Sequence, residues 1–183
     1  MIDQQRVKDL AKQFASNTID IRRHIHANPE LSYEEYKTAK FVAEQLRTMG
    51  IEPQEGVAGT GLVAIIEGKN PEKYTVALRA DMDALPIQET SDISYKSVHD
   101  GIMHACGHDG HTAMLLGAAE VLSQLKDSLK GTVKFIFQPA EEGEGGARFM
   151  IEDGCLDGVD EIYGIHVWSY QKYGTVGVKE GPI

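Results

Sequence analysis

Eight consecutive residues, from 104 to 111, read His-Ala-Cys-Gly-His-Asp-Gly-His and gather three imidazoles, a thiol and a carboxyl group in one short segment. The chain has only seven histidines in 183 residues, so this concentration is not explained by composition. Thiolate and imidazole are preferred ligands of zinc, and imidazole also binds iron, nickel and copper. The apolar run that begins at residue 112 is typical of a helix. The segment therefore predicts a metal site on the turn that enters a helix.

Three other polar clusters follow predicted strands. Asp81 and Asp83 come after a strand that ends near residue 80, Glu141 and Glu142 follow the next one, and His166 lies near the end of a third. Ligands of open α/β sheets bind beyond the carboxyl ends of the strands, so the four segments together predict one site.

Each of these clusters also has an ordinary interpretation when it is taken alone. An aspartate after a strand often caps a turn, a pair of glutamates is usually a solvated surface, and a histidine among apolar neighbours is usually a core residue. Because all four segments occur in one chain, a shared metal site is favoured over these ordinary interpretations. Of the other histidines, His24 and His26 are interpreted as surface residues or as groups behind the site, and His99 receives no role.

The elements that must position these side chains alternate along the chain. Ser32 with Glu35 three residues later matches a capping box, and Gly50 is well placed after the end of that helix. Helices are predicted at 3–27, 32–49, 111–126 and 147–152, and strands at 62–66, 74–79, 132–137 and 161–167, with a further strand left open at 173–178. This alternation predicts an α/β fold, a three-layer sandwich around a mixed, largely parallel sheet.

Composition narrows the class of protein. The chain is long enough for one domain, and 42% hydrophobic with 25% charged residues is ordinary for a globular protein. A net charge of −10 without a basic block argues against nucleic acid or an anionic membrane as a partner. The first residues do not resemble a signal peptide, and no apolar stretch is long enough for a bilayer. Cys106 and Cys155 are too few for a disulfide framework, so we expect a cytoplasmic protein with free thiols.

Five segments together resemble the M20 metallopeptidase family. They are the motifs at 22–32, 78–87 (Leu-Arg-Ala-Asp-Met-Asp-Ala-Leu-Pro-Ile), 104–115, 135–142 (Phe-Ile-Phe-Gln-Pro-Ala-Glu-Glu) and 164–167 (Gly-Ile-His-Val). The similarity is strongest to the amidohydrolase branch, with hippurate hydrolases, N-acyl-amino-acid aminoacylases and auxin-conjugate hydrolases. It covers essentially the whole chain in the order and spacing of the family.

The resemblance implies roles for individual residues. Glu141 is implied as the general base, and Asp83 as the carboxylate that orients a ligand and supports the base. Asp81, His104, Asp109 and His111 lie inside matched motifs but are not assigned as ligands. The implied ligands of two divalent ions, manganese, zinc or cobalt, are Cys106, His108, Glu142 and His166. The implied reaction is hydrolysis of the amide bond of an N-acyl amino acid or a short peptide.

The resemblance also implies a longer parent protein. Family members are about twice this length and carry a lid domain, through which homo-oligomers often form, and then a last part of the catalytic domain with one more metal-binding histidine. Residues 1–183 are therefore expected to be the N-terminal portion of a zinc-peptidase-like catalytic domain. We expect this portion alone to bind metal poorly and to be weak or inactive as an enzyme.

Several alternatives stay open at this point. One is a di- or carboxypeptidase of the same family, and another is an inactive metal-binding fragment. A hydrolase with Cys106 as nucleophile would survive chelators, whereas a metal enzyme would not. A zinc deaminase is disfavoured because a Pro-Cys-x-x-Cys motif is absent from the sequence. A purely structural zinc site is also disfavoured, since such sites are usually rich in cysteine.

Overall fold

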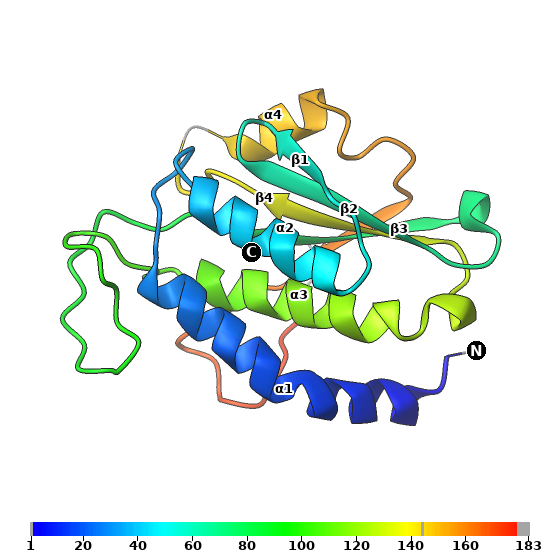
Figure 1. The fold of residues 1–183 in the computed structure, drawn as a ribbon, viewed down its shortest axis with the longest axis horizontal. Helices are drawn as coiled ribbons and strands as arrows, with labels where there is room; N and C mark the ends of the chain where they lie inside the picture. The colour runs from blue at the N-terminus through cyan, green and yellow to red at the C-terminus, as the bar shows by residue number, and fades with distance from the viewer. Residues whose placement is uncertain (1, 144, 179–183) are drawn as a thin grey trace.

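The computed structural model describes residues 2–143 and 145–178 and contains three layers. Three helices cover one face of a five-stranded sheet, and a short helix lies on the other face (Figure 1). The helices are α1 (Gln4–Ala27), α2 (Tyr36–Thr48), α3 (His108–Ser123) and α4 (Gly146–Glu152), with short 3₁₀ turns at Pro71–Lys73 and Lys126–Ser128. The strands are β1 (Gln54–Val57), β2 (Gly61–Glu67), β3 (Thr75–Asp81), β4 (Thr132–Gln138) and β5 (Glu161–Gly164).

The sheet has the order β1-β2-β4-β3-β5. β3 pairs in parallel with both β4 and β5, whereas β2 is antiparallel to both β1 and β4. Because only β2 is reversed, β1, β3, β4 and β5 point the same way, and the predicted mixed, largely parallel α/β sandwich is confirmed. The carboxyl ends of β3, β4 and β5 consequently meet at one edge of the sheet.

The period of two along the strands separates the two faces of the sheet. Leu62, Phe135 and Phe137 point to the face covered by α1, α2 and α3, and they belong to the larger buried core. Val63 and Ile136 point to the opposite face, where they pack with Met150 of α4. The central strands of the sheet are therefore held between two apolar layers.

Several predicted boundaries were wrong. α2 begins at Tyr36 and not at Ser32, because the hydroxyl of Ser32 donates to Asp83 and the carboxylate of Glu35 turns into the core. α3 starts three residues before the predicted helix, so His108 lies in its first turn, and β5 ends at Gly164, before His166. β1 was not predicted, and residues 173–178 form no strand.

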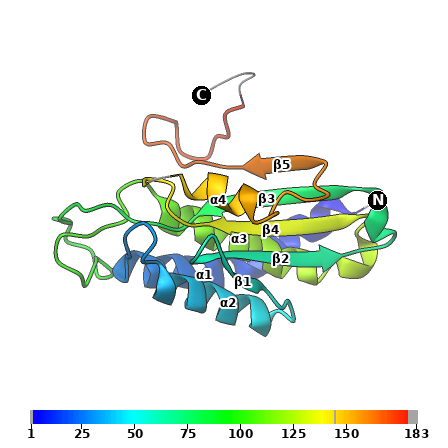
Figure 2. The same cartoon turned by 90° about the horizontal axis from the view of Figure 1, so that it is seen from above.

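The side of the molecule around β5 differs from the rest. All four residues of β5 are exposed, and β5 forms one of the two edge strands of the sheet, opposite β1 (Figure 2).

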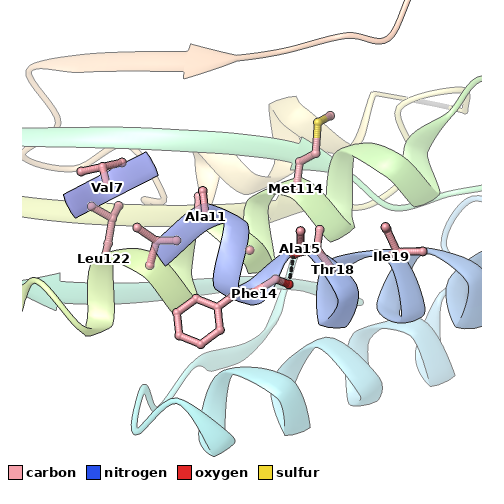
Figure 3. A pocket seen from close by; sticks show the side chains of 11 residues that line it. Val7, Ala11, Phe14, Ala15, Thr18, Ile19, Met114 and Leu122 are labelled. Carbon is pink, nitrogen blue, oxygen red and sulfur yellow. Dashed lines mark hydrogen bonds between the residues drawn. The ribbon is translucent and has the colours of Figure 1, made fainter. Parts of the chain in front are cut away.

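An apolar groove runs between α1 and α3 (Figure 3). Its lining includes Val7, Ala11 and Phe14 of α1 and Met114, Val121 and Leu122 of α3. None of the helices in the described part of the chain combines the length and hydropathy that a membrane-spanning helix needs.

Candidate metal centre

His108 lies at the centre of the predicted site. The first turn of α3 holds this side chain completely buried, and its Nε2 atom has no hydrogen-bond partner among the described residues. Nε2 is 3.7 Å from a carboxylate oxygen of Asp81, and 3.8 Å from one oxygen each of Glu141 and Glu142. A buried nitrogen without a partner, faced by three carboxylates, suits a bound cation, because both its lone pair and the negative charges need compensation.

Asp83 fixes the orientation of His108 from behind. The Nδ1 atom of His108 is 2.9 Å from the carbonyl oxygen of Asp83, which can only accept, so Nδ1 carries the hydrogen and donates. The lone pair of Nε2 therefore points toward the glutamates. The carboxylate of Asp83 also accepts from the backbone amides of Glu141 and Glu142, at 3.0 and 2.9 Å. Burial by itself raises the pKa of Asp83, but the hydrogen bonds from His108, Ser32 and these amides lower it overall.

A second group of ligating atoms joins His108 to the β5 side. The ligand atoms of Cys106, His108 and His166 lie within 4.8 Å of one another, and Sγ of Cys106 is 3.5 Å from Nε2 of His166. The Nδ1 atom of His166 donates to the carbonyl of Val167 at 2.7 Å, so its Nε2 lone pair faces the thiol. Burial and the neighbouring Glu142 raise the pKa of Cys106 to about 12. A bound divalent cation would reverse this effect, since it stabilises the thiolate.

A third group, Asp81 with His108 and His111, also satisfies the distance condition, but the polar atoms of Asp81 and His111 already form hydrogen bonds. His111 donates from Nδ1 to Asp81 at 2.6 Å and accepts at Nε2 from the amide of Val167 at 2.9 Å. The guanidinium of Arg79 takes the other oxygen of Asp81 at 2.6 Å. Burial raises the pKa of Asp81, but the hydrogen bond from His111 and the nearby positive groups lower it to about 2. This group holds the segment after β5 to α3 and offers few free ligand atoms.

A second set of buried groups lies behind the ligands, and the sequence did not predict its contacts. His26 is buried, in line with the second of its two interpretations, and its two ring nitrogens contact Asp109 at 2.8 Å and Glu89 at 3.1 Å. Arg22 donates to the same oxygen of Asp109 at 2.7 Å. Asp109 directly follows His108, so this network holds the first turn of α3. The only signal in the sequence was the motif at 22–32, which the resemblance did not tie to any contact. His24 is exposed, as one of its two interpretations required.

His104 remains apart from these groups. It is buried, and neither ring nitrogen has a hydrogen-bond partner among the described residues. Burial lowers its pKa to about 4, so the imidazole is neutral at pH 7. His104 is not part of any of the three ligand groups.

The donor set fits divalent metal ions. All three groups share His108, and two of them keep free lone pairs. Together these two groups contain the implied ligands and the implied base, namely Cys106, His108, Glu142, His166 and Glu141. Imidazole and thiolate suit zinc or cobalt, and carboxylates suit manganese, so the donors do not distinguish the ions. The glutamate side chains are partly exposed, and the site is open to a substrate from that direction.

Three known proteins are similar to this chain in sequence or in fold. A thermostable carboxypeptidase 2 from Saccharolobus solfataricus is 54% identical over 98% of this chain and 46% of its own length. An N-acyl-L-amino acid amidohydrolase from Geobacillus stearothermophilus is 47% identical over 98% of this chain and 48% of its own length. The structure of the YXEP protein of Bacillus subtilis, described as a dinuclear metal-binding peptidase, superposes with a TM-score of 0.88 at 47% identity, over 93% of this chain and 48% of that one.

These matches also fix the extent of the similarity. The chain spans about half the length of the curated relatives that it matches. The family model described as peptidase family M20/M25/M40 matches residues 77–181, which is more than half of the chain and includes every proposed metal ligand. The chain therefore belongs to peptidase family M20/M25/M40.

Proposed function

We propose that the chain forms the metal-binding half of a hydrolase that cleaves the amide bond of N-acyl amino acids. The observation that carries the proposal is the buried, unpartnered Nε2 of His108, which faces Glu141 and Glu142 while Asp83 holds the opposite side of the ring. Cys106, His108, Glu142 and His166 are the proposed ligands of two divalent ions. Glu141 is the proposed general base.

Individual residues of this chain have separate roles in the proposed reaction. When bound, two divalent ions acidify a water molecule and polarise the scissile carbonyl. The carboxylate of Glu141 takes a proton from the attacking water and returns it to the departing amine. Asp83 keeps the amides of Glu141 and Glu142 and the ring of His108 in a fixed relation. Adjacent glutamates can thus have separate roles, one as ligand and one as base.

The substrate class rests on the relatives. The Geobacillus protein is named an amidohydrolase of N-acyl-L-amino acids, which supports removal of an acyl group. The Saccharolobus protein is named a carboxypeptidase, so hydrolysis of a short peptide is the second candidate. Both substrates are small molecules that end in a carboxylate. The free thiols Cys106 and Cys155 suit a reducing compartment such as the cytoplasm.

We further propose that these residues are the N-terminal portion of a catalytic domain whose remaining part, with a lid, follows in the parent hydrolase. Half-length coverage of the relatives supports this proposal. The groove between α1 and α3 and the exposed apolar side chains on and beyond β5 also support it (Figure 3). Apolar surface of this extent is costly in water and is normally covered.

Metal loading and substrate hydrolysis test the function separately. Elemental analysis of the purified chain, loaded with manganese or zinc and then desalted, measures how many ions it holds. The parent hydrolase is assayed with N-acetyl and N-benzoyl amino acids and with dipeptides, with and without chelator. We expect loss of hydrolysis in chelator, recovery on adding manganese, zinc or cobalt, and a preference for the acylated substrates. Activity that survives chelation but not alkylation of Cys106 would overturn the proposal.

Glu141→Gln is the matched variant for this assay. It keeps the shape of the base but cannot accept a proton, so kcat is expected to fall by about 10² to 10⁴ while metal content stays unchanged. Glu152→Gln, an exposed glutamate on α4, is the control and should leave both quantities unchanged.

A further inference from the structure

Glu35 has an unusual environment for a carboxylate. Its side chain is completely buried directly before α2, and among the described residues no arginine, lysine or histidine forms an ion pair with it. Its oxygens instead accept from the hydroxyl of Thr60 at 2.6 Å and from the backbone amide of Ala140 at 2.8 Å. Burial raises its pKa above the ordinary value despite these bonds. A buried charge without a counter-ion costs stability, so a purely stabilising role explains it poorly.

Ala140 is the residue on which this bond acts. It is fully buried and has a φ of +50°, in the left-handed region that residues with a Cβ atom avoid. Such a conformation is strained and persists only when the surroundings hold it. Ala140 directly precedes Glu141. The turn at Ala140 therefore decides where the next two side chains point.

The amides of three consecutive residues are held by two buried carboxylates. Glu35 accepts from the amide of Ala140, and Asp83 accepts from the amides of Glu141 and Glu142. Asp83 also contacts His108, whereas no hydrogen bond of Glu35 among the described residues reaches a proposed ligand or the base. The hydrogen bond to the amide of Ala140 is therefore the direct link from the Glu35 carboxylate to the loop that carries Glu141 and Glu142.

We propose that Glu35 is a positioning residue, which holds Ala140 in its left-handed conformation and thereby keeps Glu141 and Glu142 facing His108. The inference deepens the proposed function and rests on it for the roles of the two glutamates. It adds a residue from before α2, more than a hundred positions away along the chain, to the machinery of the site.

Amide hydrogen exchange on the 183-residue chain without metal gives the first test. Glu35→Met keeps the volume of the side chain but removes both acceptor oxygens. We expect faster exchange at the amides of Ala140, Glu141 and Glu142 by a factor of about 10 or more, and unchanged exchange in the middle of α1. The conservative Glu35→Gln keeps one carbonyl oxygen for Ala140 and should stay close to the wild type. Unchanged exchange at Glu141 and Glu142 in Glu35→Met would overturn the proposal.

A second substitution separates positioning from general stabilisation. Glycine adopts positive φ without penalty, so Ala140→Gly should reduce the dependence of the loop on Glu35. We expect the double variant Glu35→Met/Ala140→Gly to recover much of the protection at Glu141 and Glu142, although its thermal stability stays below that of the wild type. If the exchange rates rise equally in both backgrounds, Glu35 merely stabilises the fold. Glu35→Asp, one methylene too short to reach Ala140, replaces Glu35→Met if that variant does not fold.

Cobalt titration of the parent hydrolase links the loop to the metal centre. The visible absorption of bound Co²⁺ reports its coordination, and loss of support behind the ligands typically weakens metal affinity about 10–100-fold. We expect Glu35→Met to weaken Co²⁺ binding to this extent and Ala140→Gly to restore part of it. Faster exchange without any Co²⁺ binding by the wild-type parent hydrolase would contradict the metal proposal and leave the role of Glu35 in the loop standing. Faster exchange with unchanged Co²⁺ affinity and spectrum would overturn the positioning of the ligand.

Discussion

The two sides of the proposed metal centre are built differently. On one side His108 is fully buried in the first turn of α3, and Asp83 holds both its ring and the loop of the two glutamates. On the other side His166 follows β5, whose four residues are all exposed, and donates only to the adjacent Val167. One side is organised by the core of the sandwich, whereas the other is attached through a single strand pairing and the bond from Val167 to His111.

This contrast shows where ordering costs arise when metal binds. A side chain that is already fixed loses little conformational entropy on ligation, whereas a loosely held one loses up to about 2 kcal/mol. We therefore expect the His108 side to determine whether metal binds at all. The Cys106 and His166 side should depend on additional polypeptide packed against β5.

Loss of His108 gives the largest expected effect. His108→Ala removes the ligand common to both open groups and should abolish binding of both ions, with an affinity loss of more than about 100-fold, beyond that of a supporting residue. His166→Ala removes a ligand from one group only and should leave one ion bound. Metal content by elemental analysis of the parent hydrolase compares the two variants. Equal losses would show that the two sides contribute alike.

Asp83→Asn comes next, because Asp83 supports the buried side. The amide keeps the shape but presents an NH₂ group to the backbone donors, so we expect a metal affinity weaker by about 10–100-fold and a loss of about 1–3 kcal/mol in the free energy of unfolding. Isothermal titration and chemical denaturation measure the two quantities. Asp92→Asn, in the 82–103 loop, is the control. An unchanged metal affinity in Asp83→Asn would contradict the assigned support.

A pH dependence should come from the network behind α3. The hydrogen bond that His26 donates to Asp109 is the main cause that raises the pKa of His26, against the effect of burial, and Glu89 adds to it. A pKa raised in the folded state means that protonation stabilises the fold below about pH 6.5, and that this stabilisation is lost as the pH rises through the higher folded pKa. When the folded and unfolded pKa values of a group differ by one, the free energy of unfolding changes by about 1.4 kcal/mol. Denaturation from about pH 5 to about pH 9, which brackets the ordinary pKa of histidine, should show the decline. His26→Gln should reduce it without abolishing it, because the pKa of His108 is also raised.

The smallest effect is expected beyond β5. Tyr173 is fully exposed, so Tyr173→Ser should change the free energy of unfolding of this chain by no more than about 0.5 kcal/mol. The same substitution in the parent hydrolase should cost more if additional polypeptide covers this segment. Denaturation of both proteins provides the comparison, and an equal, negligible change in both would argue against a cover at Tyr173.

Local patterns in the sequence predicted most of the fold. The periods of the helices and strands and the breaks between them placed α1, β2, β4 and α4, and the alternation indicated the α/β sandwich. β1 was not predicted because its residues, Gln54-Glu-Gly-Val, show no alternating apolar pattern. The start of α2 was wrong because a glutamate three residues after a serine looks like a capping box whether it caps a helix or enters the core.

By itself the sequence determined which residue types are available to bind metal, since the segment at 104–111 and the residues after the strands are readable as local motifs. Only the tertiary structure decided which of these groups have free lone pairs. Asp81 and His111 form hydrogen bonds with each other, and Arg79 and Val167 donate to Asp81 and His111 respectively. Nε2 of His108, by contrast, has no hydrogen-bond partner among the described residues. The tertiary structure also showed that Glu35 does not cap α2 but accepts a hydrogen bond from the amide of Ala140. The physical reason is that hydrogen bonds between residues 30–105 positions apart depend on how helices and strands pack, and no local pattern records that packing.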